Sequence, residues 1–135
     1  MHTLPLQIRF NDVDLMGHVN NAVIMEFFDL GKANYFSDAG MPVTPEEGDF
    51  TVMVVHVEVD FHSQIHFRDH IAVTTCISHW GNKSLKVTQQ VVNTETGEPC
   101  ATCNTVMSGY SRSAATSAVI PEEIKERIRL YDASH

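Results

Sequence analysis

The sequence predicts an α+β protein in which a curved antiparallel sheet of about five strands wraps around one long central helix. Two observations predict this architecture. Residues 21–38 have helical character and are apolar around most of the helix circumference, which places such a helix in an interior rather than on a surface. Long segments of strand character, joined by short turns, follow this helix and favour a mostly antiparallel sheet.

The elements preceding the sheet are expected to be a strand, a polar loop and the central helix. Residues 4–10 alternate weakly and predict a first strand, and residues 11–17 have the Asp, Asn and Gly content of a loop. Asn20 or Asn21 can cap a helix that runs to about Ala39. A glycine and two prolines then end the helix.

The remaining segments alternate between apolar and polar residues as strands do, up to a final helix. Strands are expected at residues 51–62, 71–80, 84–93 and 100–110, and the last helix at residues 121–130. The 51–62 strand is long and apolar, so it is an aggregation-prone edge unless it pairs with another strand. We therefore expect a homodimer formed by edge-to-edge pairing.

Composition excludes several classes of protein. The 135 residues fit one domain, 1–135, and a net charge of −8 argues against binding to nucleic acid or an anionic membrane. Three cysteines, an odd number, disfavour a disulfide framework, so buried or half-buried thiols are expected. No apolar run spans a bilayer and no signal peptide is recognisable. These features predict a soluble cytoplasmic protein.

The densest group of chemically useful side chains is residues 9–21, between the first strand and the central helix. The N–H groups that begin a helix can hold an oxyanion, and a carboxylate beside them can attack a carbonyl or activate water. A loop whose Asp and Asn residues merely cap the helix is the competing interpretation, and composition alone favours it. The position of this loop at the rim of the apolar interior favours a catalytic site.

The segment Asp12-Val13-Asp14-Leu15-Met16-Gly17-His18-Val19-Asn20-Asn21 resembles the D-x-D-x-x-G-H-V-N-N motif of hotdog-fold acyl-CoA thioesterases of the 4-hydroxybenzoyl-CoA thioesterase type. Weaker similarity extends over 60–71, 80–84 and 120–124. The resemblance implies the wrapped-helix architecture and hydrolysis of acyl-CoA thioesters to a carboxylic acid and coenzyme A. Dimers of dimers are common in the resembled family, so the resemblance adds this assembly as an alternative to the simple homodimer.

The resemblance also implies site residues. Asp14 matches the catalytic carboxylate, acting as nucleophile or general base, and Asn21 matches the position whose backbone N–H polarises the thioester carbonyl. Gly17 matches a tight turn, and His18 is expected to orient the catalytic loop. Asp29 matches an acidic position on the inner helix.

Coenzyme A carries phosphates, so an acidic protein needs a local basic site for it. The turn Gly81-Asn82-Lys83-Ser84 is the expected phosphate contact, partly by its resemblance, although a plain hairpin turn explains it equally well. No cofactor is expected beyond the coenzyme A of the substrate. His62, His66 and His70 are spaced by four, but no geometry fixes them, and solvated histidines explain them better than a metal site.

Two other functions stay open at this stage. A hotdog protein can bind acyl chains or acyl carriers without hydrolysis, because a fold does not determine an activity. A metal-binding or redox protein is the third interpretation. The acyl group, the carrier and the choice between nucleophilic and general-base action are not determined by the sequence.

Overall fold

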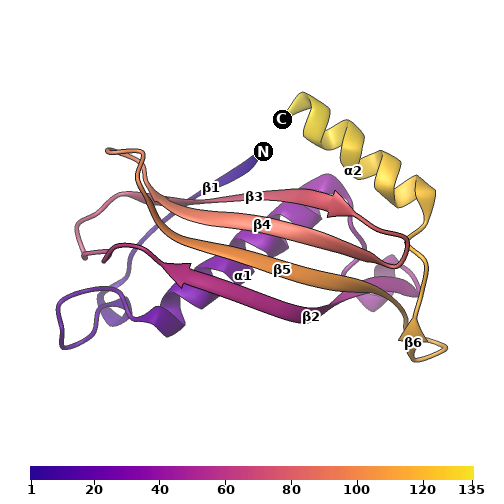
Figure 1. Cartoon of the computed structure of the whole chain (residues 1–135), viewed down its shortest axis with the longest axis horizontal. Coiled ribbons are helices and arrows are strands. Elements are labelled where there is room, and N and C mark those ends of the chain that lie inside the picture. Colours follow the sequence, from indigo (N-terminus) through magenta and orange to yellow (C-terminus); the bar gives the residue numbers. More distant parts are fainter.

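The computed structural model describes the whole chain, residues 1–135, and consists of one curled sheet, a long helix packed against it and a shorter helix at the C-terminus (Figure 1). The elements are β1 (His2–Leu6), α1 (Asn21–Ala39), β2 (Phe50–Phe61), β3 (Ile71–Trp80), β4 (Ser84–Asn93), β5 (Pro99–Ser111), β6 (Thr116–Ser117) and α2 (Glu122–Ser134). Two short 3-10 turns lie at Phe10–Asp12 and Pro45–Glu47.

All strand pairs are antiparallel, in the order β1-β3-β4-β5-β2, with the two-residue β6 also paired to β5. The sheet curls over one side of α1, and α2 lies beside the C-terminal end of β3 (Figure 1). This arrangement confirms the predicted fold: a curled antiparallel half-barrel packed on a long central helix, the hotdog fold.

The predicted bounds of β3 and β4 are confirmed, but the prediction for the first strand is wrong. The strand spans His2–Leu6 and not residues 4–10, because its ladder with β3 ends where Leu6 meets Ile71, the first residue of β3. The Asp12 carboxylate then accepts the Arg9 backbone N–H at 2.8 Å. This local bond turns the chain into a 3-10 turn where the sequence pattern still suggested a strand.

The central helix approaches the sheet closely at one small residue. A Cβ atom on Gly31 would lie 2.6 Å from a methyl carbon of Val73, so only glycine fits at this contact. The buried Gln89 side chain, 1% exposed, donates from Nε2 to the Phe28 carbonyl at 2.9 Å and to Thr75 Oγ1 at 3.0 Å. These contacts set the depth at which α1 lies in the sheet.

The β2 edge confirms the expectation of a long strand with an unpaired side. β2 pairs only with β5, and five of its large apolar side chains are exposed: Met53, Val54, Val55, Val57 and Phe61. An exposed apolar edge of this length is an unusual surface for an isolated chain, although a register shift between Val54 and His56 interrupts the ladder with β5.

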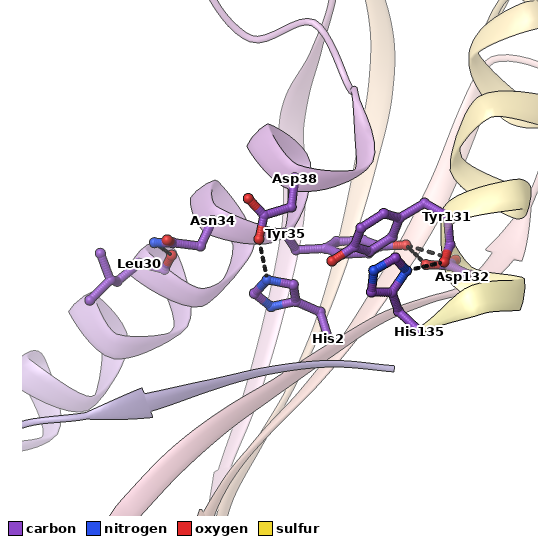
Figure 2. A network of polar contacts seen from close by, with 8 residues as sticks. All are labelled: His2, Leu30, Asn34, Tyr35, Asp38, Tyr131, Asp132 and His135. Atoms are coloured by element: carbon purple, nitrogen blue, oxygen red, sulfur yellow. Dashed lines mark hydrogen bonds and ion pairs between the residues drawn. The ribbon is translucent and has the colours of Figure 1, made fainter.

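The α2 end of the molecule is closed by polar contacts (Figure 2). Tyr35 on α1 is fully buried, and its hydroxyl lies 2.8 and 2.9 Å from the two carboxylate oxygens of Asp132 on α2. Burial, and then the hydrogen bond to Asp132, raises the pKa of Tyr35 well above its ordinary value of 10.0. Beside it, His2 Nε2 lies 2.9 Å from Asp38 Oδ2.

Two further expectations concern the state of the cysteines and the presence of a membrane-spanning segment. All three cysteines are free; Cys100 and Cys103 are buried and Cys76 is half-buried, and burial raises the pKa of Cys103 and Cys76. No helix has both the length and the apolar character needed to cross a membrane.

Candidate active site

The loop before α1 folds into a short two-stranded ribbon. Val13 and Val19 pair in antiparallel fashion, and the Asp14 N–H donates to the His18 carbonyl at 3.0 Å. The Gly17 N–H donates back to the Asp14 carbonyl at 3.1 Å, with Gly17 at a φ of +89° that favours glycine. Asp14, Gly17 and His18 are therefore parts of one small hydrogen-bonded unit.

The Asp14 carboxylate has a defined orientation at the tip of this ribbon. Its Oδ1 accepts the Met16 N–H at 2.8 Å, which forms an Asx turn. Asp14 is half-buried and lines a hollow of about 710 Å³ bordered by Phe10, Asn11, Val13, Leu15 and Phe67. One acidic group thus lies in a mostly apolar hollow.

The other aspartate of the motif has a different role. Asp12 is 1% exposed, and its carboxylate accepts the Arg9 backbone N–H at 2.8 Å and the Arg9 guanidinium at 3.1 Å. The hydrogen bond and the charge of Asp12 raise the pKa of Arg9. The Asp12 carbonyl also accepts the Asn20 N–H at 3.0 Å. Asp12 therefore holds the loop before α1 at both of its ends, Arg9 and Asn20, and it does not border the Asp14 hollow.

The first turn of α1 leaves one backbone donor free. Asn20 caps the helix, its side chain accepting the Ala22 N–H at 2.7 Å and its carbonyl accepting the N–H groups of Val23 and Ile24. The Asn21 N–H has no hydrogen-bond partner anywhere in the chain. An unused N–H at the positive end of a helix dipole can stabilise a developing oxyanion.

His18 and Asn21 face a second, smaller hollow of about 270 Å³, which is bounded on its far side by Phe61, His62 and the residues up to Ile65. His18 makes no side-chain hydrogen bond; it holds the ribbon through its carbonyl. Asp14 is not among the residues lining this hollow. Within one chain, the carboxylate and the start of the helix therefore flank the same ribbon but border neighbouring hollows.

The turn Gly81–Ser84 is rigidly held. Its four carbonyls accept hydrogen bonds from Lys125 Nζ at 3.0 Å and from the N–H groups of Ile120, Gly109 and Gly81 at 3.0, 2.7 and 2.7 Å. The Asn82 and Lys83 N–H groups have no partner in the chain. The turn thus directs its acceptors inward and presents two N–H donors and the Lys83 ammonium, a set suited to an anion.

The structure does not bring all the predicted residues together in a single chain. The Asp14 ribbon lies at the end of the sheet where α1 and β3 begin, and the Gly81–Ser84 turn lies at the opposite end (Figure 1). The ten residues of β3 separate them, roughly 30 Å at the rise of a strand. Asp29 borders a third hollow, between β1 and α1, where its exposed carboxylate lies 3.7 Å from Lys32 Nζ.

Sequence reasoning missed the apolar border of the Asp14 hollow. The apolar helix residues Ile24, Phe27 and Phe28 are buried in the core and do not border this hollow. Phe10, Leu15 and Phe67 instead border Asp14, with exposed fractions of 84%, 107% and 47%. Apolar residues at 10 and 15, on either side of the acidic pair, were the available signal.

Comparison with known proteins places this arrangement in a family. Residues 8–128 match the family described as the Thioesterase-like superfamily, and the chain belongs to it. The chain is 26% identical to the uncharacterized protein YsmA of Bacillus subtilis over 123 residues, which cover 91% of this chain and 82% of that protein.

Solved structures of thioesterases are similar to this chain. A Thermus thermophilus thioesterase, complexed with coenzyme A and Zn, is 33% identical, with a TM-score of 0.79 over 94% of this chain and 96% of that one. Slr0204, a 1,4-dihydroxy-2-naphthoyl-CoA thioesterase from Synechocystis, shares the fold with a TM-score of 0.84 and 19% identity, over 99% and 98% of the two chains. The chain is thus an acyl-CoA thioesterase-like hotdog protein.

Proposed function

We propose that this protein hydrolyses acyl-CoA thioesters, with Asp14 as nucleophile or general base and the Asn21 N–H as the oxyanion donor. One observation carries the proposal: the helix cap uses every N–H of the first turn except that of Asn21, and the Asp14 carboxylate lies on the ribbon that leads into that turn. A thioester has a good leaving group, so a carboxylate and one fixed N–H suffice in principle.

A homodimer completes this site in the proposal. β2 ends at the Asp14 end of the sheet, where its last residue, Phe61, borders the His18–Asn21 hollow. It begins at the opposite end, which also holds Ser84, because Phe50 and Ser84 pair with neighbouring parts of β5, at Ser111 and Ser108. Antiparallel pairing of two β2 edges about a two-fold axis sets the start of one strand beside the end of the other.

The same pairing gives the Gly81–Ser84 turn a function. In the dimer, the turn of one subunit lies at the Asp14 end of the other. The Lys83 ammonium and the free N–H groups of Asn82 and Lys83 would then contact the phosphates of a coenzyme A whose thioester lies near Asp14. The exposed apolar residues of β2 become the subunit contact.

The test is turnover of a panel of acetyl-, hexanoyl-, dodecanoyl- and benzoyl-CoA, followed by chromatographic release of free coenzyme A. The wild type should hydrolyse at least one of these, and Asp14→Asn and Asp14→Ala should lower kcat by roughly 10²–10⁴-fold. Glu126→Gln, which removes the same charge from the exposed face of α2, should keep the wild-type rate.

Two outcomes would count against the proposal. Near-normal kcat in Asp14→Asn would remove the carboxylate from the mechanism. Tight binding of acyl-CoA by the wild type without release of coenzyme A would instead identify a non-catalytic acyl-binding protein.

A further inference from the structure

A single aromatic ring separates two hollows at the Asp14 end of the molecule. Phe67 is the residue that borders both the Asp14 hollow and a second one of about 630 Å³. The second hollow lies between the end of β1 and the start of β3. Pro5, Leu6, Ile8 and Ile71 form its apolar side, and Arg68, Asp69 and His70 border it as well. Phe10, the other ring beside Asp14, borders only the first hollow.

The backbone presents Phe67 in a fixed position. It lies in a turn closed by the Asp69 N–H donating to the His66 carbonyl at 3.0 Å, and by the His66 N–H donating to Asp69 Oδ2 at 2.8 Å. Two bonds across one turn hold its conformation at both ends. The ring is about half exposed, at 47%, so one face is free to meet a ligand.

The same turn is tied to the Asp14 ribbon. The carbonyl of Ile65, a core residue at 0% exposure, accepts the Val19 N–H at 2.7 Å, and Val19 pairs with Val13, the neighbour of Asp14. The segments that contain Phe67 and Asp14 are thus hydrogen-bonded to each other through Ile65 and Val19. These backbone contacts set the separation of the two side chains.

Charge defines what the Asp14 hollow accepts. Asp14 is the single charged residue among those bordering it, so the hollow offers no counterion to an acyl group that carries a carboxylate. An uncharged hydrocarbon acyl group matches the lining of Phe10, Val13 and Leu15, and its carbonyl carbon must lie beside the Asp14 carboxylate for reaction to occur.

We infer that Phe67 is the wall that sets the maximum length of the acyl group, limiting the wild type to acyl groups that fit the Asp14 hollow. This inference rests on the proposed function, since it assigns the acyl group of that reaction to the Asp14 hollow. Removal of the ring joins the two hollows and admits a longer chain. Phe10 contributes apolar contact without limiting length.

The test compares kcat/KM for hexanoyl-CoA and tetradecanoyl-CoA in three variants. Phe67→Ala should raise the ratio of tetradecanoyl to hexanoyl turnover by about tenfold or more, the scale on which an apolar pocket discriminates size. Phe67→Trp should lower that ratio, and Phe10→Ala, the matched aromatic control, should lower both rates in similar proportion. Succinyl-CoA should be a poorer wild-type substrate than the similarly sized pentanoyl-CoA.

The outcomes separate the two hypotheses. An active wild type whose length ratio is unchanged in both Phe67 variants would overturn the inference and leave the proposed function standing. A wild type inactive on the whole panel would overturn the proposed function and, with it, the inference. If gel filtration shows that Phe67→Ala alters the oligomeric state, the ring belongs to a subunit contact and the inference is wrong.

Discussion

The two ends of the sheet differ in how complete they are within one chain. At the α2 end, Tyr35, Met41 and Ile128 are fully buried, and the Tyr35 hydroxyl is bonded to Asp132 (Figure 2). At the Asp14 end, Phe10 and Leu15 are exposed and the Asn21 N–H has no partner. Exposed apolar side chains gathered at one end favour a binding partner that covers them, and a free N–H can donate to such a partner. In the proposed function, the open end is where the acyl group and a second subunit bind.

The largest effect is expected from breaking the proposed subunit contact. Val55→Lys puts a charge near the middle of β2, where an antiparallel two-fold pair brings the residue close to its own copy, and like charges there repel. We expect a monomer by sedimentation and activity near background. Leu130→Lys on α2, a residue exposed to the same 62% as Val55, is the control; equal activity in both variants would contradict the dimer.

The next effect is expected from removing the one free N–H in the first turn of α1. Asn21→Pro deletes that donor at the first helical position, where proline is tolerated, and the ψ of 140° at Asn20 suits a residue before proline. We expect kcat to fall by about 10²–10³-fold with an unchanged melting temperature. Asn21→Ala keeps the N–H and should keep most activity, and matching losses in the two variants would exclude the backbone donor.

A smaller effect, on stability alone, is expected at the closed end. Tyr35→Phe leaves the Asp132 carboxylate without its hydroxyl donor and should cost about 1–3 kcal/mol of unfolding free energy. Tyr110→Phe is the control, because that hydroxyl has no hydrogen bond in the chain. Acyl-CoA hydrolysis should not change in either variant. A kinetic defect in Tyr35→Phe would show that the closed end takes part in the site.

The pH dependence sharpens the same test. The folded state raises the pKa of Tyr35 above its ordinary value of 10.0, so the unfolded chain loses this proton first as pH rises. The contribution of Tyr35 to the free energy of unfolding is therefore fully present below pH 10 and declines above it. Denaturant unfolding should show this alkaline decline in the wild type, and Tyr35→Phe should show a smaller one.

The smallest effect is expected at the Gly81–Ser84 turn, which the proposed dimer brings to the Asp14 end of the other subunit. Lys83→Glu should raise KM for acyl-CoA roughly three- to tenfold with little change in kcat, because the phosphates lie far from the reacting carbon. Lys86→Glu makes the same change in net charge at an exposed position of β4. An equal rise in KM in both variants would attribute the effect to overall charge rather than to the turn.

The sequence by itself determined the helices and strands and the candidate catalytic segment. The apolar circumference of α1, the Asn20 cap and the alternation of β3 and β4 are local patterns, and local patterns reflect local backbone preferences. The first strand was the exception: its ladder with β3 ends at Leu6, and the bond from Arg9 to Asp12 then turns the chain, neither of which alternation reveals.

Only the tertiary structure decided which groups are free and which share a hollow. The unused Asn21 N–H, the occupied carbonyls of the Gly81–Ser84 turn and the place of Phe67 between two hollows all depend on partners distant in sequence. A residue pattern shows which groups can bond, whereas the register of the sheet and the depth of α1 decide which of them find a partner.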